Sequence, residues 1–581
     1  MSAIKETQWI ISETDANLKL MSEVLKISEI TACVMAHRGI RTKNIALSFL
    51  APSIDRLRDP MQLKDMSKAL QRISAAIESN EKIMIYGDYD VDGIMSTVIL
   101  YKALRRLNAD CEYYIPHRIE EGYGLNIAAV EKLAKKGAKL LITVDNGISA
   151  ITEVAAAVEL GMDTIIIDHH EPVETLPPAV AIVDPKQADC EYPFKEMCAA
   201  GLVFKLSMAL CEYVNTPLTT HERDELLSLA AIATLCDIVN LSDENRILVN
   251  SGLAVLNANK LINAGLGSLI TMRGYLEKTI DTFTVGFVLG PCLNATGRLG
   301  SAELAVDLLL ASAEDTPKRM NLAQELTELN ESRKSLTSEC VERALATLPE
   351  ESPKVLVLTD PEAHESVAGI VAGRIREATF RPTILLTKGD GAMKGSGRSI
   401  EGYNLFEALY AQRHLFTRFG GHAMAAGLTL PEENINPLRE ALNKDCTLTE
   451  NDFRPKIQID RELTPEDVTL ALADELSRLA PFGKGNSEPL FAIYNIYAEK
   501  IRVMDEKNTL IFTFATKKGR RLKGIAFGLN EAFAKATAAV KANKTGDIAM
   551  DVAFTIETNE WNKNVEVQLR IRDFRVLSRL T

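Results

Sequence analysis

The chain has 581 residues, of which 46% are hydrophobic and 25% charged, and its net charge is −13. A chain this long predicts three to five domains at roughly 100–200 residues each, and the composition excludes a disordered or fibrous protein. The acidic total also argues against a broad basic face of the kind that usually binds nucleic acid.

The sequence carries no sign of a membrane or secreted protein. No apolar run approaches the roughly 20 residues that cross a bilayer, and the first residues lack the basic and apolar pattern of a secretion signal. Nine scattered cysteines without a CxxC pair are typical of reduced thiols. We therefore expect a cytoplasmic protein without membrane association.

The first part of the chain predicts helices followed by an α/β region. The first 80 residues are expected to be mostly helical, with apolar positions at helical spacing over residues 63–77, for example. Four short apolar runs then predict strands, at residues 82–86, 140–144, 164–167 and 181–183. Near-continuous apolar strands that alternate with helices indicate a parallel sheet covered on both faces.

The remainder predicts a connecting helix and two further regions. Residues 314–348 have leucines at helical spacing among many charges, which predicts one long helix between domains. A second α/β region follows, with strands at 354–358 and 383–386, a helix at 366–379 and a glycine-rich segment ending at Gly427. Five β segments then predict a small barrel of the OB type, at residues 490–497, 509–515, 521–527, 547–556 and 565–571.

Acidic and histidine side chains gather where apolar runs end. They are Asp88, Asp90 and Asp92 after the first strand, Asp145 after the second, Asp168, His169 and His170 after the third, and Asp237 after the apolar run 226–236. Ligands of open α/β sheets bind outside the carboxyl ends of the strands, so these side chains can converge on one crevice. Carboxylates packed together repel one another, and a bound dication removes that repulsion. Oxygen and imidazole ligands suit Mn²⁺, with Mg²⁺ as the alternative, and their number suffices for two ions.

Each of these features alone has an ordinary structural interpretation. A single aspartate at a strand end is most often a helix N-cap. A calcium loop that began at Asp88 would need a glutamate at its twelfth position, where the chain has Ile99. Two adjacent histidines are seldom structural, because each ring needs its own partners. The combination is therefore much more specific than any of its parts.

The combined motifs resemble those of the DHH phosphoesterase superfamily. Further motifs are similar to the bacterial RecJ-type single-strand-specific DNA exonucleases, and the similarity extends from Trp9 to Phe574. These motifs are residues 116–118 with 121–125, 294–298, 395–399, 420–427 and 481–486. Two positions depart from the family pattern. Cys292 stands where the family usually has arginine, and Ala363 stands where it has tryptophan before His364.

The resemblance implies an α/β fold in several parts. These are a DHH domain with a parallel sheet, a long connecting helix, a smaller α/β DHHA1 domain and a C-terminal OB-like β-barrel. The predicted boundaries are 1–80 for an N-terminal helical extension of the DHH domain, 81–313 for the DHH domain, 314–350 for the connecting helix, 351–448 for the DHHA1 domain and 455–577 for the OB-like domain.

The resemblance also implies a role for each candidate residue. Two divalent ions, Mn²⁺ in preference to Mg²⁺, would be held by Asp88, Asp90, Asp92, Asp145, His169 and Asp237, with Asp145 as the bridge. Catalysis would depend on Asp88, Asp145 and His170, and Asp168 would orient His169 from behind. Substrate phosphates would contact Asn294, Arg298, Ser396, Arg398, Gly421 and His422. The DNA strand would contact Lys517, Lys518, Arg520, Arg521 and Lys523, although a solvated hairpin tip is the usual interpretation of such a basic run.

The implied function is 5′-to-3′ hydrolysis of single-stranded DNA to mononucleotides by two-metal-ion chemistry, in DNA repair and recombination. One alternative is a DHH-type phosphodiesterase of short oligonucleotides or cyclic dinucleotides, which generally lacks a C-terminal barrel. A second is a non-catalytic DNA-binding replication scaffold, whose relatives lose metal carboxylates. The expected partners are single-stranded DNA, a single-strand-binding protein and a repair helicase, and the expected state is a monomer.

Overall fold

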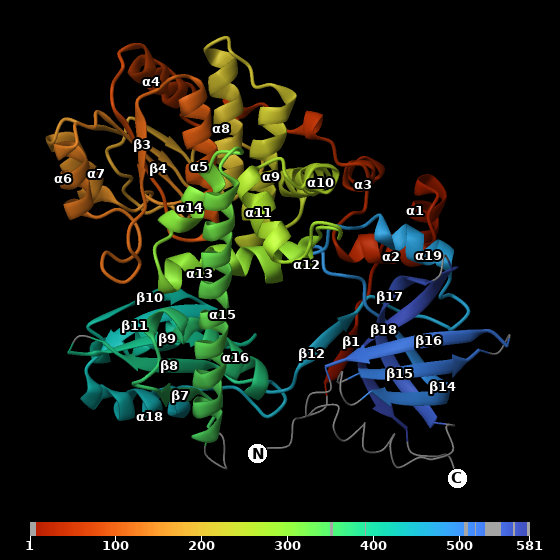
Figure 1. Ribbon diagram of the computed structural model, residues 1–581. Coiled ribbons are helices and arrows are strands. Elements are labelled where there is room, and N and C mark those ends of the chain that lie inside the picture. The colour runs from red at the N-terminus through yellow and green to blue at the C-terminus, as the bar shows by residue number, and fades with distance from the viewer. Residues whose placement is uncertain are drawn as a thin grey trace. The chain divides into compact units, whose positions relative to one another are not determined.

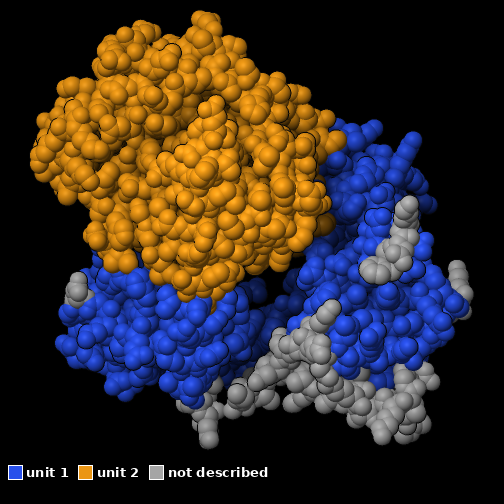
Figure 2. Space-filling view, in the orientation of Figure 1, with its two compact units in different colours: residues 1–50, 335–480, 488–581 blue, residues 51–334, 481–487 orange. Residues whose placement is uncertain are grey.

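The computed structural model describes residues 7–348, 353–389, 391–504, 509–516, 519–528, 548–561 and 564–577. The chain divides into two compact units (Figure 2). Unit 1 comprises residues 1–50, 335–480 and 488–581, and unit 2 comprises residues 51–334 and 481–487. Within the described ranges, no helix is both long enough and apolar enough to cross a membrane.

Unit 2 is built on a five-stranded sheet with strand order β3-β2-β4-β5-β6, in which every pair is parallel (Figure 1). The strands are β2 (Ile83–Tyr86), β3 (Cys111–Tyr114), β4 (Leu140–Val144), β5 (Asp163–Ile167) and β6 (Ala181–Val183). Residues of β2 and β4 are buried on both faces of the sheet, which explains why the sequence shows continuous apolar runs there. The parallel sheet predicted from those runs is confirmed. Strand β3, whose four residues are Cys, Glu, Tyr and Tyr, is the strand that the runs did not indicate.

Helices cover both faces of this sheet. The helices of unit 2 are α4 (Met66–Glu78), α5 (Val91–Arg106), α6 (Ile127–Lys135), α7 (Ile151–Glu159), α8 (Ala199–Tyr213), α9 (Thr220–Cys236), α10 (Asp243–Ala258), α11 (Ala264–Met272), α12 (Thr282–Thr284), α13 (Gly290–Leu299) and α14 (Glu303–Leu310). Helices α4, α5, α8 and α9 share one apolar core with Ile142 and Ile165 of the sheet. Helices α6 and α7 pack on the opposite face, against Leu141 and Ile166. The two helical layers leave the carboxyl ends of the strands as an open edge of the unit 2 sheet.

A single long helix, α15 (Thr316–Ala346), passes from unit 2 into unit 1. Its bounds lie within two residues, at either end, of the long helix predicted at 314–348. The predicted connecting helix is therefore part of the fold.

Unit 1 contains a second α/β layer. Its sheet has the order β10-β11-β9-β8-β7, parallel between β7 and β8 and antiparallel elsewhere. The elements are β7 (Leu356–Thr359), α16 (Glu365–Thr379), β8 (Thr383–Lys388), β9 (Met393–Arg398), α17 (Leu405–Ala411), β10 (Arg418–His422), β11 (Ala425–Leu430) and α18 (Ile435–Asp445). Helix α16 packs on one face, where Val371 meets Leu385, and α17 and α18 pack on the other.

The C-terminal strands of unit 1 form a closed five-stranded barrel. Strand β14 pairs with β15 and β17, β15 with β16, β16 with β18, and β18 with β17, so the circle is complete. The bounds are β14 (Phe491–Met504), β15 (Thr509–Ala515), β16 (Arg521–Phe527), β17 (Ile548–Trp561) and β18 (Asn564–Val576), with helix α19 (Leu470–Ser477) before them. The predicted OB-like barrel is confirmed. Phe512 and Phe514 stack 5.6 Å apart in its core.

The N-terminal residues differ from the prediction. Strand β1 (Gln8–Ile11) pairs in parallel with β12 (Lys456–Ile459). In the chain, β12 is followed by the short strand β13 (Arg461–Glu462). Helices α1 (Leu18–Leu25), α2 (Glu29–His37) and α3 (Lys43–Leu50) follow, and residues 1–50 group with unit 1 rather than with the DHH sheet. Residues 1–50, predicted as part of a 1–80 extension of the DHH domain, thus lie in unit 1, and a strand that pairs with residues about 450 positions away leaves no local signal.

Candidate active site

The predicted acidic and histidine residues converge at the carboxyl edge of the unit 2 sheet. Among the residues that the structure describes, three groups offer ligand atoms that lie within 4.8 Å of one another. They are Asp88, Asp90 and Asp145; Asp92, His169 and Asp237; and Asp145, His169 and His170. Because Asp145 and His169 each belong to two groups, the three groups form one continuous cluster.

The loop after β2 turns directly into helix α5 and presents three carboxylates. Asp90 is the N-cap of α5, and its Oδ1 accepts from the backbone N–H of Asp92 at 2.9 Å and of Gly93 at 3.1 Å. Asp92 accepts from the backbone N–H groups of Ala199 and Ala200 at 2.8 and 2.9 Å, at the start of α8. Gly93 is required here, because a Cβ would lie 2.5 Å from the backbone of Asp88. Asp90 thus fulfils both interpretations, a helix cap and a candidate ligand.

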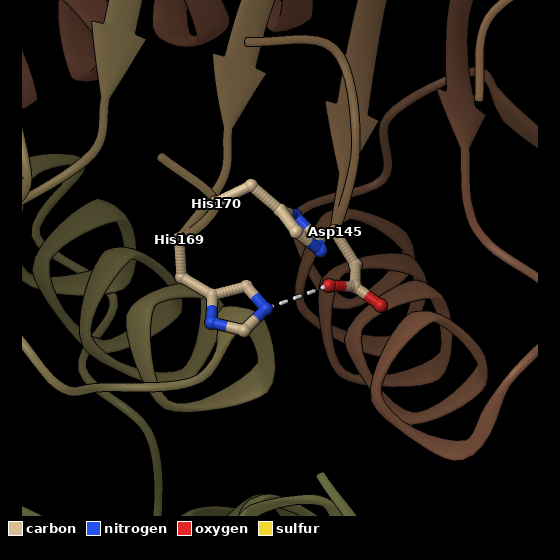
Figure 3. A group of neighbouring side chains, drawn as sticks. All are labelled: Asp145, His169 and His170. Atoms are coloured by element: carbon tan, nitrogen blue, oxygen red, sulfur yellow. Dashed lines mark hydrogen bonds and ion pairs between the residues drawn. The ribbon is translucent and has the colours of Figure 1, made fainter. Parts of the chain in front are cut away.

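Asp145 lies at the centre of the cluster in a strained conformation. It follows β4 and has φ +65°, a left-handed value that is uncommon for residues other than glycine. Its Oδ1 is 3.1 Å from Nε2 of His169, and Figure 3 shows the ring and the carboxylate facing one another. Backbone strain at a residue other than glycine persists where the surroundings enforce it, typically at functional sites.

Asp237 reaches the cluster from a helix rather than from a strand. The apolar run 226–236 is part of helix α9, and Asp237 caps the C-terminus of that helix. Its Oδ2 lies 3.8 Å from Nδ1 of His169. His169 therefore stands between Asp145 and Asp237, with one ring nitrogen toward each.

His170 forms a separate hydrogen-bonded chain. Its Nδ1 donates to Asp168 Oδ1 at 2.7 Å, and its Nε2 lies 3.2 Å from the hydroxyl of Tyr123. Asp168 also accepts from the backbone N–H groups of residues 148, 169 and 170. Asp168 was expected to orient the ring of His169; its carboxylate accepts from the His170 ring and from the backbone N–H of His169. Tyr123 lies within the family motif at residues 121–125, but the sequence gave no sign of its contact with His170.

The pKa values of the cluster follow from burial and mutual repulsion. Burial and the charge of Asp90 raise the pKa of Asp88, and burial and the charge of Asp92 raise the pKa of Asp145. The same causes raise the pKa of Asp237 to about 7 and that of Asp92 to about 6. These four carboxylates therefore resist ionisation together unless a cation joins them.

The two histidines differ in charge. Burial lowers the pKa of His169, which keeps its imidazole neutral and able to ligate a metal. Burial also acts to lower the pKa of His170, but the hydrogen bond to Asp168 and the charges of Asp168, Asp237 and Asp92 together outweigh burial and raise the value to about 9. His170 is therefore a cation at neutral pH, beside a cluster that would bind dications and phosphate.

The chemistry of the donors fits divalent metal ions. Asp88 Oδ1 and Asp237 Oδ2 are buried and accept no hydrogen bond within the described ranges. Buried carboxylate oxygens without partners are costly, and a bound ion satisfies them. The oxygen-rich set with one neutral imidazole suits Mn²⁺ or Mg²⁺ better than zinc.

Two predicted phosphate contacts lie on α13 of unit 2. A Cβ on Gly297 would lie 2.4 Å from the carbonyl oxygen of Tyr89, so α13 packs directly on the loop that carries the first carboxylates. Arg298 follows, and its charge acts on the Tyr89 hydroxyl. Asn294 is half-buried one turn earlier. Cys292, which replaces the usual arginine, is buried and donates to the carbonyl oxygen of Val288 at 3.2 Å.

The other predicted phosphate contacts form one surface in unit 1. Arg398 on β9 is level with Ala425 on β11, which is level with His422 on β10, so the Arg398 and His422 side chains share a face of the sheet. Ser396 lies on that face two residues away, level with Gly427. A Cβ on Gly427 or Gly420 would meet nothing within 4 Å. The space at these two glycines, between the polar side chains of this face, is here named the open lane. Gly421, with φ +145°, packs against Ala426.

The predicted DNA contacts of the barrel have mixed outcomes. Lys517 and Lys518 lie outside the described residues. Arg520 donates to the carbonyl oxygens of Pro465 and Val468, whereas Arg521 and Lys523 are exposed on the outer face of β16. Arg521 also lies 3.2 Å from Glu499.

Comparisons with known proteins agree with this arrangement. Models of the DHH family N-terminal domain, the DHHA1 domain and the RecJ OB domain match residues 82–234, 352–447 and 459–573. The single-stranded-DNA-specific exonuclease RecJ of Bacillus subtilis (strain 168) is 38% identical over 98% of this chain and 71% of its own length. That of Escherichia coli (strain K12) is 33% identical over 92% of this chain and 94% of its own. The crystal structure of RecJ with Mn²⁺ from Thermus thermophilus aligns with a TM-score of 0.82, 29% identity, and coverage of 100% of this chain and 81% of that one.

Proposed function

This chain belongs to the RecJ family of single-stranded-DNA-specific exonucleases, and we propose that it hydrolyses single-stranded DNA from the 5′ end and releases mononucleotides. The observation that carries the proposal is the continuous cluster of carboxylates around Asp145, together with a neutral His169. In this cluster Asp88 Oδ1 and Asp237 Oδ2 are buried and accept no hydrogen bond from the described part of the chain. A nuclease needs such a set at one place, whereas a binding scaffold does not.

The ligand groups suggest how two divalent ions would be divided. Asp88, Asp90 and Asp145 would hold one, and Asp92, His169 and Asp237 would hold the other. Asp145 is the residue best placed to bridge them, because it is 3.1 Å from His169 and also belongs to the first group. When bound, such a pair of ions activates a water molecule and stabilises the leaving oxygen of an in-line displacement.

His170 would act on the substrate rather than on a metal. Its hydrogen bond to Asp168 keeps the ring protonated and fixes its orientation. The Nε2–H group, which meets Tyr123 in the structure, can then donate to a non-bridging oxygen of the scissile phosphate. Asp168 thus positions a cation for the chemistry that the neighbouring carboxylates support.

Phosphates further along the strand would be bound by Arg298 in unit 2 and by the open lane in unit 1. Arg398 and His422 flank the lane on the same face, and the glycines within it allow close approach of a phosphodiester backbone. The barrel would contact the strand through Arg521, Lys523 and the exposed Phe527, which alternate with core residues along β16.

We expect a monomer that acts in the bacterial cytoplasm during repair and recombination, supplied with single strands by a helicase and a single-strand-binding protein. A phosphodiesterase of short oligonucleotides is less well supported, because a barrel with an outward basic row is of no use to a dinucleotide. A non-catalytic scaffold has no need of the repelling carboxylates.

The test uses a single strand labelled at either end, a duplex control, and Mn²⁺ or EDTA. We expect mononucleotides from the 5′ end in Mn²⁺ only. Asp145→Ala should abolish cleavage and weaken Mn²⁺ binding, and Asp110→Asn, an exposed carboxylate at the opposite edge of the sheet, should change neither. Turnover of dinucleotides alone, or strand binding without turnover, would support the alternatives instead.

A further inference from the structure

A short segment of unit 2 comes from a distant part of the sequence. Residues 481–487, here named the strap, belong to unit 2 although the chain on both sides belongs to unit 1. The strap has the sequence Pro-Phe-Gly-Lys-Gly-Asn-Ser and contains one of the motifs that carried the family resemblance. None of its residues belongs to the candidate metal ligands, so the catalytic cluster does not explain why this motif is present.

The strap is a tightly specified turn. Gly483 and Asn486 exchange two backbone hydrogen bonds, of 2.9 and 3.1 Å. The Asn486 side chain is buried, and its Nδ2 donates to the carbonyl oxygen of Pro481 at 2.9 Å. Gly485 has φ +75°, a conformation that favours glycine. These features give the strap one shape of its own.

The strap holds the residues that follow Asp237. The backbone N–H of Leu241 donates to the carbonyl oxygen of Lys484 at 2.8 Å. A Cβ on Gly483 would lie 2.6 Å from Cδ1 of Leu241, and a Cβ on Gly485 would lie 3.3 Å from Oδ1 of Asn240. Larger residues in the strap would therefore push directly on the segment 238–241.

The buried Arg246 ties the strap to helix α10. Its guanidinium donates to the carbonyl oxygen of Pro481 at 3.4 Å, and the side chain is 2% exposed. Next to it, Asn245 donates to the carbonyl oxygen of Asn240 at 3.0 Å. The segment after Asp237 is thus held from both sides, by the strap and by α10.

The segment needs holding because it contains a strained residue. Ile238, directly after Asp237, has φ +57°, which is a genuine outlier for a β-branched side chain. Its side chain is 65% exposed, so packing of that side chain cannot be what enforces the conformation. Strain of this kind persists only where the surroundings impose it. The backbone bond to the strap, three residues later, is a constraint of the required kind.

We propose that the strap is a positioning element for Asp237. By holding the segment 238–241, it keeps Ile238 in the left-handed conformation and the Asp237 carboxylate directed at the metal cluster. The inference rests on the proposed function only in taking Asp237 as a metal ligand. The second group, Asp92, His169 and Asp237, should depend on the strap, and the first group should not.

The test is Mn²⁺ titration of the full chain by calorimetry, with the metal alone as the probe. Gly485→Ala should weaken one of the two Mn²⁺ sites by roughly tenfold or more, the usual effect of losing support behind a ligand, and leave the other unchanged. The matched control is Gly161→Ala, at a glycine of the same unit with φ +76° and no atom near its absent Cβ. It should lower the melting temperature to a similar extent without weakening either site.

A second variant distinguishes positioning from general destabilisation. Asparagine tolerates the left-handed conformation, so Ile238→Asn removes the strain that would pull Asp237 away when the strap is loosened. Ile238→Asn with Gly485→Ala should therefore recover most of the lost Mn²⁺ affinity. Equal weakening in both glycine variants, or no recovery in the double variant, would overturn the proposal. If the unmodified chain bound no Mn²⁺, the assignment of the metal ligands would fail instead.

Discussion

The metal-free protein should become more stable when one of its catalytic carboxylates is removed. Asp237 is the most informative position, because burial and the charge of Asp92 raise its pKa to about 7. Its Oδ2 accepts no hydrogen bond within the described ranges, so Asp237→Asn removes a charge and breaks no hydrogen bond at that atom. The variant isolates the electrostatic cost of the site.

The sign and size follow from the pKa in the folded and unfolded states. An aspartate whose pKa rises from 3.8 to about 7 on folding favours the folded state at low pH, and this contribution is lost as the pH rises through 7. The cost of ionising it in the folded protein reaches about 4 kcal/mol at most above pH 7, at about 1.4 kcal/mol per pH unit. The advantage of Asp237→Asn should therefore grow by about 2–3 kcal/mol between pH 5 and pH 8.

Scanning calorimetry in EDTA measures the difference in unfolding free energy between the variant and the unmodified chain. The unfolding transition to compare is the one whose midpoint Mn²⁺ shifts. A gain of 2–3 kcal/mol corresponds to roughly 5–10 °C in a domain of 150–250 residues. Asp110→Asn, the exposed control, should show no pH-dependent gain. With Mn²⁺ at 100 times its dissociation constant, the unmodified chain should gain about 2.7 kcal/mol, and the variant should gain less.

The stability advantage of the variant should thus shrink, by up to about 2.7 kcal/mol, when the metal is added. A variant that is less stable than the unmodified chain in EDTA at pH 8, and no worse at pH 5, would refute the reasoning. It would mean that Asp237 is held in its ionised form by groups of the protein, and that the cluster needs no cation for its charges to coexist.

Two other predictions concern strand binding and the core. Arg521→Gln with Lys523→Gln should lower the slope of log affinity against log salt by roughly 0.7 for each charge in single-strand binding, and an unchanged slope would make this row a solvated face. Lys205→Met should destabilise unit 2 by up to about 3–5 kcal/mol in denaturant titrations, since buried Glu244 loses the cation at 2.8 Å and keeps Arg58 at 3.4 Å as an ion-pair partner. Lys19→Met, at an exposed position, should change stability by about 0.5 kcal/mol or less.

The sequence predicted strands correctly where burial of the strand dictates a local pattern of apolar residues. Strands β2, β4, β5 and β6 are buried between two helical layers, so their apolar runs were unambiguous, and the polar residues that end them had to lie at one edge. The barrel strands β15 and β16 were predicted at their observed bounds, because polar and apolar residues alternate along them.

What the sequence could not predict depends on contacts between distant residues. The pairing of β1 with β12 joins segments about 450 residues apart. Sequence adjacency could not show which of two neighbouring rings folds back on the Asp168 carboxylate, and in the structure it is the ring of His170. The strap is a further case, since its own turn chemistry was visible in its glycines, but its contact with Leu241 was not.

The net charge of −13 is compatible with an anionic substrate because the acidic residues that matter for the substrate are concentrated, buried and short of partners. Carboxylates arranged in this way repel each other and raise one another's pKa values, which is an instability that only cations relieve. The same cluster would therefore attract dications and, once they are bound, phosphate. Nearby cationic groups need only be few and well placed, as His170 is through its hydrogen bond to Asp168. A broad basic face would add affinity for duplex as readily as for a single strand, so a few fixed cations serve better in an enzyme that must leave duplex DNA intact.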